Sequence, residues 1–351
     1  MVNKMSENLI GTIKTEGLTK IYRVKQKKGL FKSEIKEIHA LKGISLDIQK
    51  GEVFGLLGPN GAGKTTFIKI LTTLLLPDGG RAFVNGFDVV KYPYSVKKTI
   101  GVMLMGERSL YWKLTGRENL EYFAALYHIP SRQVKKRVSE VIDFTGIQDF
   151  ADRLVETYSS GQKMALAFAK ALLNDAPVLF LDEPTNAMDP GRAIEVRKII
   201  KKLKDEFGKT ILITTHMMHE ADAICDRVAI IDKGKIMALG TPTELKQTVK
   251  HRGVIELDVL GNNIKSILPE LEKIDSVEKV VYSFDSNNGE LIKVRVLCER
   301  PRIALPEVVT IFSRHSAKVS SVNLLEPTLE DVFIQYTGRR LSEDTREGDG
   351  E

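Results

Sequence analysis

The sequence contains no apolar run long enough to cross a bilayer. Its longest apolar stretches, Ile70–Leu76 and Val178–Leu181, fall far short of the roughly 20 residues that a membrane helix needs. The first ten residues also lack an apolar signal segment. We therefore expect no membrane span, so that any role at a membrane is that of a peripheral subunit on its cytoplasmic face.

Cysteine is almost absent from the chain. Cys225 and Cys298 are the only two, and they lack the spacing of metal ligands. We expect both to pack as small apolar side chains in a reducing compartment. The 351 residues are 42% hydrophobic and 28% charged, which is typical of a globular protein and sufficient for two domains.

The formal charge of +6 is modest and unevenly distributed. The segment Lys20–Lys42 holds eight basic residues against two acidic ones. A solvated loop is the expected explanation, and attraction to anionic lipid or nucleic acid is the alternative. Residues 339–351 end in an acidic stretch that predicts a disordered tail.

A glycine-rich loop is the most informative feature that is present. It follows the apolar run Glu52–Leu57, which predicts a buried strand, and precedes Thr65–Leu76, which predicts a helix. This arrangement aims backbone amides and the positive helix end at phosphate groups. The loop matches the pattern G-x-x-x-x-G-K-[ST] with Gly58, Pro59, Asn60, Gly61, Ala62, Gly63, Lys64, Thr65 and Thr66. We expect Lys64 to contact the β- and γ-phosphate oxygens, and Thr65 to ligate Mg²⁺.

Further motifs follow the loop in an order that selects among nucleotide-binding proteins. The predicted strand Val178–Leu181 ends at Asp182 and Glu183, which could hold Mg²⁺ and polarise an attacking water. The segment Tyr158–Gln162 predicts a second helix start that offers amides to a phosphate. His216 ends the next predicted strand, where a lone histidine would more often be a capping or packing residue.

In this order, residues 12–246 resemble the ATP-binding subunit of ATP-binding cassette (ABC) transporters. The resemblance identifies the glycine loop as Walker A, and Lys64, Glu183 and His216 as catalytic. It implies that Asp182 and Thr65 hold Mg²⁺. It also implies ATP-binding residues outside Walker A, namely Tyr22 on the adenine, Ser159, Gly161 and Gln162 of the signature motif, and Asp189 of the D-loop.

The sequence departs from the family pattern at two points. Tyr158-Ser159-Ser160 replaces the usual Leu-Ser-Gly and adds a side chain at Ser160, where glycine allows the closest backbone approach. The family's Q-loop glutamine is missing, and Glu107 occupies the best-matching position. Glu107 is either a substitute ligand for Mg²⁺ or water, or a surface residue paired with Arg108.

The predicted fold is α/β, a P-loop NTPase domain of the ABC type over residues 1–247. Helical periodicity predicts an insertion over about 113–175, including helices at Glu118–Tyr127 and Gln133–Phe144. Residues 251–338 follow a β-α-β-β-α-β order, which predicts a small α+β domain of the ferredoxin-like type. That domain could reinforce a dimer or sense a ligand.

The resemblance implies that two copies pair head to tail around two ATP molecules and drive a separate transmembrane permease. Residues 105–127, which include Trp112, correspond to the surface that receives a permease helix, although core packing would also explain these aromatics. Leu325–Ile334 and Tyr336–Arg339 resemble the end of daunorubicin-resistance exporter ATPases. The alternatives are an ABC ATPase acting on nucleic acid or ribosomes, which we consider the weaker hypothesis, and a regulator without turnover.

Overall fold

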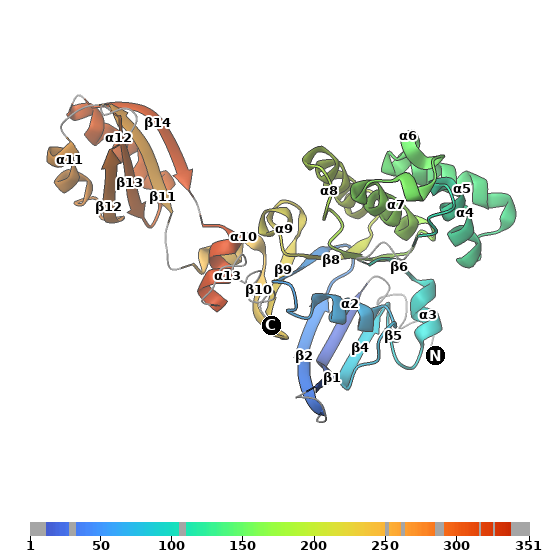
Figure 1. The fold of residues 1–351 in the computed structure, drawn as a ribbon. Coiled ribbons are helices and arrows are strands. Elements are labelled where there is room, and N and C mark those ends of the chain that lie inside the picture. The colour runs from blue at the N-terminus through green and yellow to red at the C-terminus, as the bar shows by residue number, and fades with distance from the viewer. Residues whose placement is uncertain are drawn as a thin grey trace. The chain divides into compact units, whose positions relative to one another are not determined.

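The computed structural model describes residues 12–27, 33–104, 110–249, 253–260, 264–284, 291–315, 317–325 and 327–337 (Figure 1). Contacts within the chain divide it into two compact units. The first unit consists of two segments, the chain up to Pro242 and the chain from Tyr336 onward. The second unit is Thr243–Gln335. No helix among the described residues is both long and apolar enough to cross a membrane.

A six-stranded sheet of order β10-β9-β3-β8-β7-β6 forms the centre of the first unit. Its strands are β3 (Val53–Leu57), β6 (Ile100–Met103), β7 (Val178–Asp182), β8 (Thr210–Thr215), β9 (Arg227–Asp232) and β10 (Lys235–Gly240). All neighbouring strands are parallel except β9 and β10. Strands β3, β7 and β8 are buried along their whole length, as continuous apolar runs in a covered parallel sheet should be.

Four helices of the first unit directly precede or follow strands of this sheet in the sequence. They are α2 (Lys64–Leu71), α3 (Pro93–Lys98), α8 (Pro190–Asp205) and α9 (Met218–Ile224). The prediction that the first of these extends to Leu76 is wrong. Thr73 has a φ of 63°, which ends the right-handed helix, and Leu74 and Leu76 are exposed.

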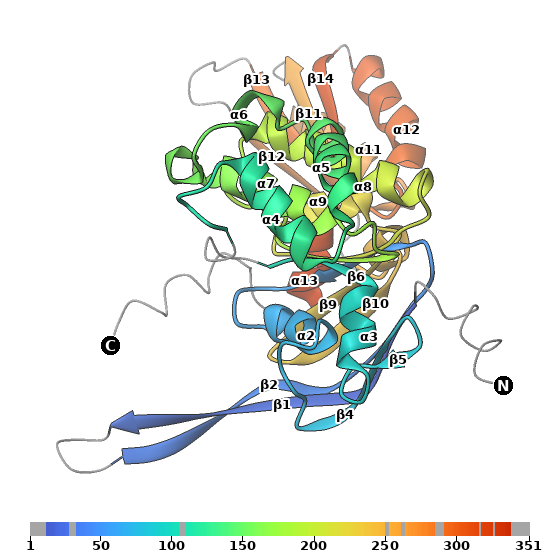
Figure 2. The same cartoon turned by 90° about the vertical axis from the view of Figure 1, so that its right-hand side faces the viewer.

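A second sheet, of order β2-β1-β4-β5, is antiparallel. Its strands are β1 (Ile13–Lys27), β2 (Ser33–Ile48), β4 (Gly79–Val84) and β5 (Phe87–Asp88). The prediction of a solvated loop over Lys20–Lys42 is therefore wrong, because the described part of this segment belongs to two paired strands (Figure 2). The exposed side chains of Arg23, Lys25 and Lys36 interrupt its apolar residues, which removes the apolar period-2 pattern of a half-buried strand.

Helices α4 (Gly116–Leu126), α5 (Ser131–Thr145), α6 (Gln148–Ala151) and α7 (Ser160–Leu172), with the 3-10 turn η3 (Val155–Thr157), form the predicted helical insertion. A capping box starts α4, since Thr115 accepts from the amide of Glu118 and Glu118 accepts from the amide of Thr115. Gly146 ends α5 with a φ of 64°. These helices share one apolar core with β7 and α8.

The second unit contains an antiparallel sheet of order β12-β13-β11-β14. Its strands are β11 (Val254–Leu260), β12 (Val277–Phe284), β13 (Leu291–Cys298) and β14 (Lys318–Leu325), and its helices are α11 (Ile264–Leu271) and α12 (Pro301–Arg314). The order along the chain is the predicted β-α-β-β-α-β. Helix α12 continues through Pro306.

Two further helices lie at the boundaries of the second unit, α10 (Pro242–Gln247) and α13 (Leu329–Thr337). The sequence Asn287-Asn288-Gly289 is typical of a hairpin turn, and it lies outside the described residues, as does the tail predicted at 339–351.

Candidate nucleotide site

The site begins where three neighbouring parallel strands end. Strand β3 pairs with β8, and β8 pairs with β7, so their carboxyl ends meet at one edge of the sheet. The Walker A loop follows β3, Asp182 and Glu183 lie at the end of β7, and His216 follows β8. Ligands of open α/β sheets bind at this edge. The structure thus brings together three motifs that the sequence spreads over residues 58–216.

Two glycines of the Walker A loop have no room for a side chain. A Cβ on Gly58 would lie 2.2 Å from the carbonyl oxygen of Ile231. Gly63, with a φ of 110°, caps α2, and a Cβ there would lie 2.5 Å from the carbonyl oxygen of Ala40. Because the N-cap residue of α2 is Gly63, no side chain at the cap accepts a hydrogen bond from the first amides of the helix. That arrangement suits an anionic ligand.

Lys64 is buried at the first position of α2. Its Nζ donates to the carbonyl oxygens of Gly58 at 2.6 Å and Pro59 at 3.0 Å, and lies 3.6 Å from Oε1 of Glu183. Burial lowers the pKa of Lys64, while Glu183 and Asp182 oppose that effect. The ammonium is held inside the loop, at the position from which it can contact a phosphate.

Thr65 and Asp182 form a hydroxyl–carboxylate pair that joins α2 to β7. Oγ1 of Thr65 donates to Oδ2 of Asp182 at 3.1 Å, and Oγ1 of Thr214 donates to Oδ1 of the same carboxylate. Magnesium prefers such oxygen ligands and completes its shell with water and phosphate. In the described part of the chain, no group of three or more His, Cys, Asp or Glu side chains could form an all-protein cage. The residues present therefore fit Mg²⁺ bound together with a nucleotide.

Glu183 is held in an unusual backbone conformation directly after this carboxylate. Its φ of 49° is rare for a residue with a side chain, and such strain concentrates at functional sites. Its amide donates to the carbonyl oxygen of Thr214 at 3.0 Å. Its Oε2 accepts from Nδ2 of Asn186 at 3.3 Å and lies 3.1 Å from Nδ1 of His216, without a well-formed hydrogen bond to that ring. The carboxylate is thus fixed from both sides.

Tyr22 lies on β1 beside the Walker A helix. Its hydroxyl is 3.4 Å from Oγ1 of Thr66, and Nζ of Lys20 lies 6.0 Å from its ring centroid. This places an aromatic ring next to the second threonine of the loop, and its contact with adenine stays a prediction.

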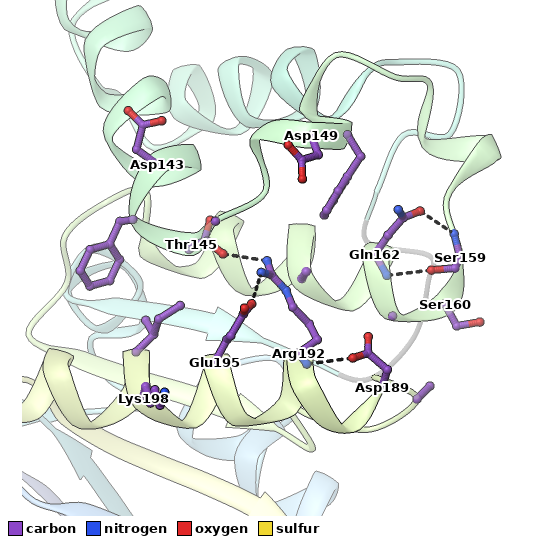
Figure 3. Close-up of a pocket in the computed structure, with 17 residues that line it drawn as sticks. Asp143, Thr145, Asp149, Ser159, Ser160, Gln162, Asp189, Arg192, Glu195 and Lys198 are labelled. Atoms are coloured by element: carbon purple, nitrogen blue, oxygen red, sulfur yellow. Dashed lines mark hydrogen bonds and ion pairs between the residues drawn. The ribbon is translucent and has the colours of Figure 1, made fainter.

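The signature residues lie at the start of α7. Oγ of Ser159 accepts from the amide of Gln162 at 3.2 Å, and Oε1 of Gln162 accepts from the amide of Ser159 at 3.0 Å. This capping box leaves Ser160 exposed, so its extra side chain faces solvent (Figure 3). Tyr158 is buried, with its hydroxyl donating to the carbonyl oxygen of Phe150.

A surface hollow of about 1060 Å³ lies against the signature (Figure 3). Its lining includes Gly161 and Asp189, and Oδ1 of Asp189 accepts from the amide of Arg192 at 2.9 Å. A Cβ on Gly161 would lie 3.1 Å from the carbonyl oxygen of Ala187, so the signature and the D-loop are packed together. None of the residues 58–66 lines this hollow. The signature and Walker A are therefore presented separately within one chain.

Two residues of the site were missed by sequence analysis, and one predicted ligand lies outside the described residues. Thr214 and Asn186 hold Asp182 and Glu183, but a threonine in an apolar strand and an asparagine in a loop carry no signal of their own. Glu107 lies outside the described residues.

Three aromatic side chains are exposed at the start of the helical insertion. Tyr111 and Tyr122 contact each other edge to face with ring centroids 4.7 Å apart, and Tyr122 contacts Phe123 in the same way at 5.5 Å. Trp112 is 46% exposed, with Nζ of Lys163 4.6 Å from its ring centroid. Phe123 reaches the core of the insertion, whereas the other three rings extend that apolar surface to solvent.

Comparisons with known proteins agree with this geometry. The family model described as ABC transporter matches residues 41–186. The daunorubicin resistance ATP-binding protein DrrA2 of Streptomyces coeruleorubidus is 38% identical over 309 residues, covering 87% of this chain and 92% of that protein. The linearmycin resistance ATP-binding protein LnrL of Bacillus subtilis is 33% identical, covering 86% and 94%. A dimeric post-hydrolysis structure of the ATP-binding cassette MJ0796, bound to ADP and Pi, has a TM-score of 0.59 and 26% identity, covering 65% and 98%.

Proposed function

The chain belongs to the ABC transporter family as an ATP-hydrolysing, ATP-binding protein, and on this premise we propose that it is the energy-coupling subunit of an exporter. In this proposal two copies pair head to tail around two ATP molecules and drive a separate transmembrane permease. Export is supported by the names of two similar proteins, DrrA2 and LnrL, which refer to daunorubicin resistance and linearmycin resistance.

One observation carries the proposal. Lys64, Asp182, Glu183 and His216 gather at the carboxyl edge of the sheet, whereas Ser159–Gln162 lines a hollow to which the Walker A loop contributes no residue. A helix start with exposed small residues can serve a phosphate only when another molecule presents one. A second copy provides this through a closed two-fold pairing in which each subunit completes the other's site.

The residues around Glu183 account for hydrolysis. Thr65 and Asp182 would hold Mg²⁺, which would neutralise charge on the phosphates, and Lys64 would contact the β- and γ-oxygens. Glu183 accepts a proton from water as the water oxygen bonds to the γ-phosphorus and the bond from that phosphorus to the β-phosphate oxygen breaks. His216 and Asn186 keep the carboxylate in position. The products are ADP and phosphate, whose like charges favour separation of the two copies.

The permease contact is supported by the exposed aromatics. Tyr111, Trp112 and Tyr122 form a rigid apolar surface at the start of the helical insertion. Aromatic side chains are the usual anchors when a groove receives a helix. Because this surface lies outside the set of residues around Lys64, a permease bound there would leave the nucleotide site accessible.

The test is a Glu183→Gln variant, which keeps the shape of the side chain and removes its basicity. We expect turnover to fall by roughly 10²- to 10⁴-fold, while Mg²⁺ and ATP convert the variant into a stable dimer visible by light scattering. An exposed control, Glu206→Gln at the end of α8, should turn over and elute as the unmodified protein does. A Glu183→Gln protein that stays monomeric with ATP, or hydrolyses at the normal rate, would refute the proposal.

A further inference from the structure

Strands β1 and β2 continue beyond the sheet to which they belong. The last pair that β1 makes with β4 is Thr19 with Gly79, whereas its pairing with β2 continues to Lys27 and Ser33. Residues 21–27 and 33–39 therefore form a two-stranded ribbon, which Figure 2 shows extending past β4. A two-stranded ribbon is marginally stable by itself in water. A ribbon of this length would therefore be stabilised by contact with another surface.

The ribbon exposes aliphatic side chains on both of its faces. Val24 is 47% exposed, Ile35 59% and Ile38 46%, and none of them belongs to an apolar core of the described structure. Val24 pairs with Lys36, and Lys25 pairs with Ile35. Because successive residues of a strand point to opposite faces, Val24 and Ile35 lie on different sides of the ribbon.

Cations accompany these aliphatic residues on each side. Lys36 shares the face of Val24, and Lys25 shares the face of Ile35. Both lysines are exposed. Nε of Arg23 forms an ion pair with Oε1 of Glu37 at 2.9 Å. The negative charge of Glu37 is therefore already neutralised within the ribbon. Beyond Tyr22, the described side chains of the ribbon thus include cations and exposed aliphatic residues on both faces, whereas a conventional docking face is apolar on one side only.

We propose that this ribbon binds an anionic lipid surface, with its aliphatic side chains in the headgroup layer and its lysines on lipid phosphates. A headgroup layer surrounds an inserted ribbon and therefore covers both faces, which a single protein partner does not. Lysine stems can lie along apolar surface while the ammonium reaches the phosphates. Nucleic acid would use the cations but leave Val24 and Ile35 without a role, since single strands bind on stacked aromatic side chains.

Vesicle sedimentation of the full chain tests the electrostatic half of the proposal. We expect binding to phosphatidylcholine vesicles with about 30% phosphatidylglycerol, little binding to phosphatidylcholine alone, and weakening by salt. A Lys25→Gln/Lys36→Gln double variant should bind on the order of 25-fold more weakly, from the contribution of each lysine near an anionic surface. The control, Lys135→Gln/Lys201→Gln, has the same net charge but changes exposed lysines on α5 and α8. It should bind like the unmodified protein.

Single substitutions on the two faces test the remaining half. Val24→Ser and Ile35→Ser should each weaken vesicle binding and leave basal ATP hydrolysis unchanged, which also shows that the variants fold. Loss with one face alone would contradict insertion of the ribbon, because only one side would then contact the lipid. The proposal would be overturned if both lysine double variants lost vesicle binding equally. It would also be overturned if the protein bound duplex DNA more tightly than vesicles and this binding required Lys25 and Lys36. This test needs neither a permease nor a dimer, so its failure leaves the proposed function intact.

Discussion

Oγ1 of Thr65 donates a 3.1 Å hydrogen bond to Oδ2 of Asp182, which joins the first turn of the Walker A helix to the end of strand β7. The two residues are far apart in sequence, and only the parallel order of β3, β8 and β7 brings them together. Their oxygens define where Mg²⁺ would bind. Each feature that holds this pair therefore has a measurable effect on metal use.

Thr214 is the first such feature, because its hydroxyl donates to the other oxygen of Asp182. Thr214→Val keeps the shape of the side chain but leaves the carboxylate free to turn. We expect Mg²⁺ affinity to fall by roughly 10- to 100-fold, as is typical when a partner of a metal ligand is removed. Thr214→Ser retains the hydroxyl and should stay close to normal in a titration of ATPase activity with Mg²⁺. Identical titrations for both variants would exclude this role.

His216 should affect turnover more than binding. Its Nδ1 lies 3.1 Å from Oε2 of Glu183, so His216→Ala removes one of the groups that flank the carboxylate. We expect kcat to fall by about 10²-fold while the affinity for a fluorescent ATP analogue changes little. The matched variant on the other side, Asn186→Ala, should act in the same direction. A large loss of analogue affinity without a change in kcat would contradict this assignment.

Lys170 predicts a pH dependence of stability. Burial on α7 lowers the pKa of Lys170 from 10.5 to about 8, with its Nζ 4.6 Å from the ring centroid of Phe123. Below pH 8 both states are protonated and the full cost of burying the charge is present. Between pH 8 and 10.5 the unfolded state holds more protons, so this residue's contribution rises with pH.

Lys170→Met should therefore stabilise the protein at pH 7 by about 1 to 3 kcal/mol. The gain should shrink as the pH rises to 9.5, which urea unfolding at several pH values would measure. Comparing the variant with the unmodified protein at each pH is necessary because burial raises the pKa of Cys225, whose effect on stability has the opposite sign. A difference that is constant across this range would show that Lys170 keeps an ordinary pKa.

Trp112 should report the permease contact. A photoreactive residue at Trp112 should crosslink, in membranes of the source organism, to an integral membrane protein whose gene neighbours this one. Phe207 is a suitable control position because it is exposed to a similar extent, 52% against 46%, but lies just after the end of α8. The same crosslinked partner from both positions would mean that the aromatic surface is not selective.

The nucleotide site was largely predictable because its signals are local. A strand, a glycine loop and a helix are adjacent in the chain around Lys64, and Asp182 and Glu183 terminate a continuous apolar run. Parallel strands then bring these ends to one edge whatever the loops between them. The order of the motifs, together with the family resemblance, was sufficient to group Lys64, Asp182, Glu183 and His216.

Features that depend on tertiary contacts were not predictable in this way. Thr214 belongs to a β-branched strand, so its hydroxyl looks like ordinary strand propensity until β8 is placed beside β7. The ribbon of β1 and β2 was mistaken for a loop because solvent reaches both faces and no side becomes uniformly apolar. The apolar residues Leu74 and Leu76 prolong the pattern of α2, although the chain leaves the helix at Thr73.

The central claim is that the signature of one copy completes the phosphate site of another, and a mixing experiment tests it most directly. Lys64→Ala disables Walker A, and Ser160→Glu places a negative charge on the exposed signature turn without removing the cap formed by Ser159. Each variant alone should be inactive. An equimolar mixture should recover up to about one quarter of normal ATPase activity, because half of the dimers then hold one intact site of two. A mixture no more active than its separate components would contradict the account.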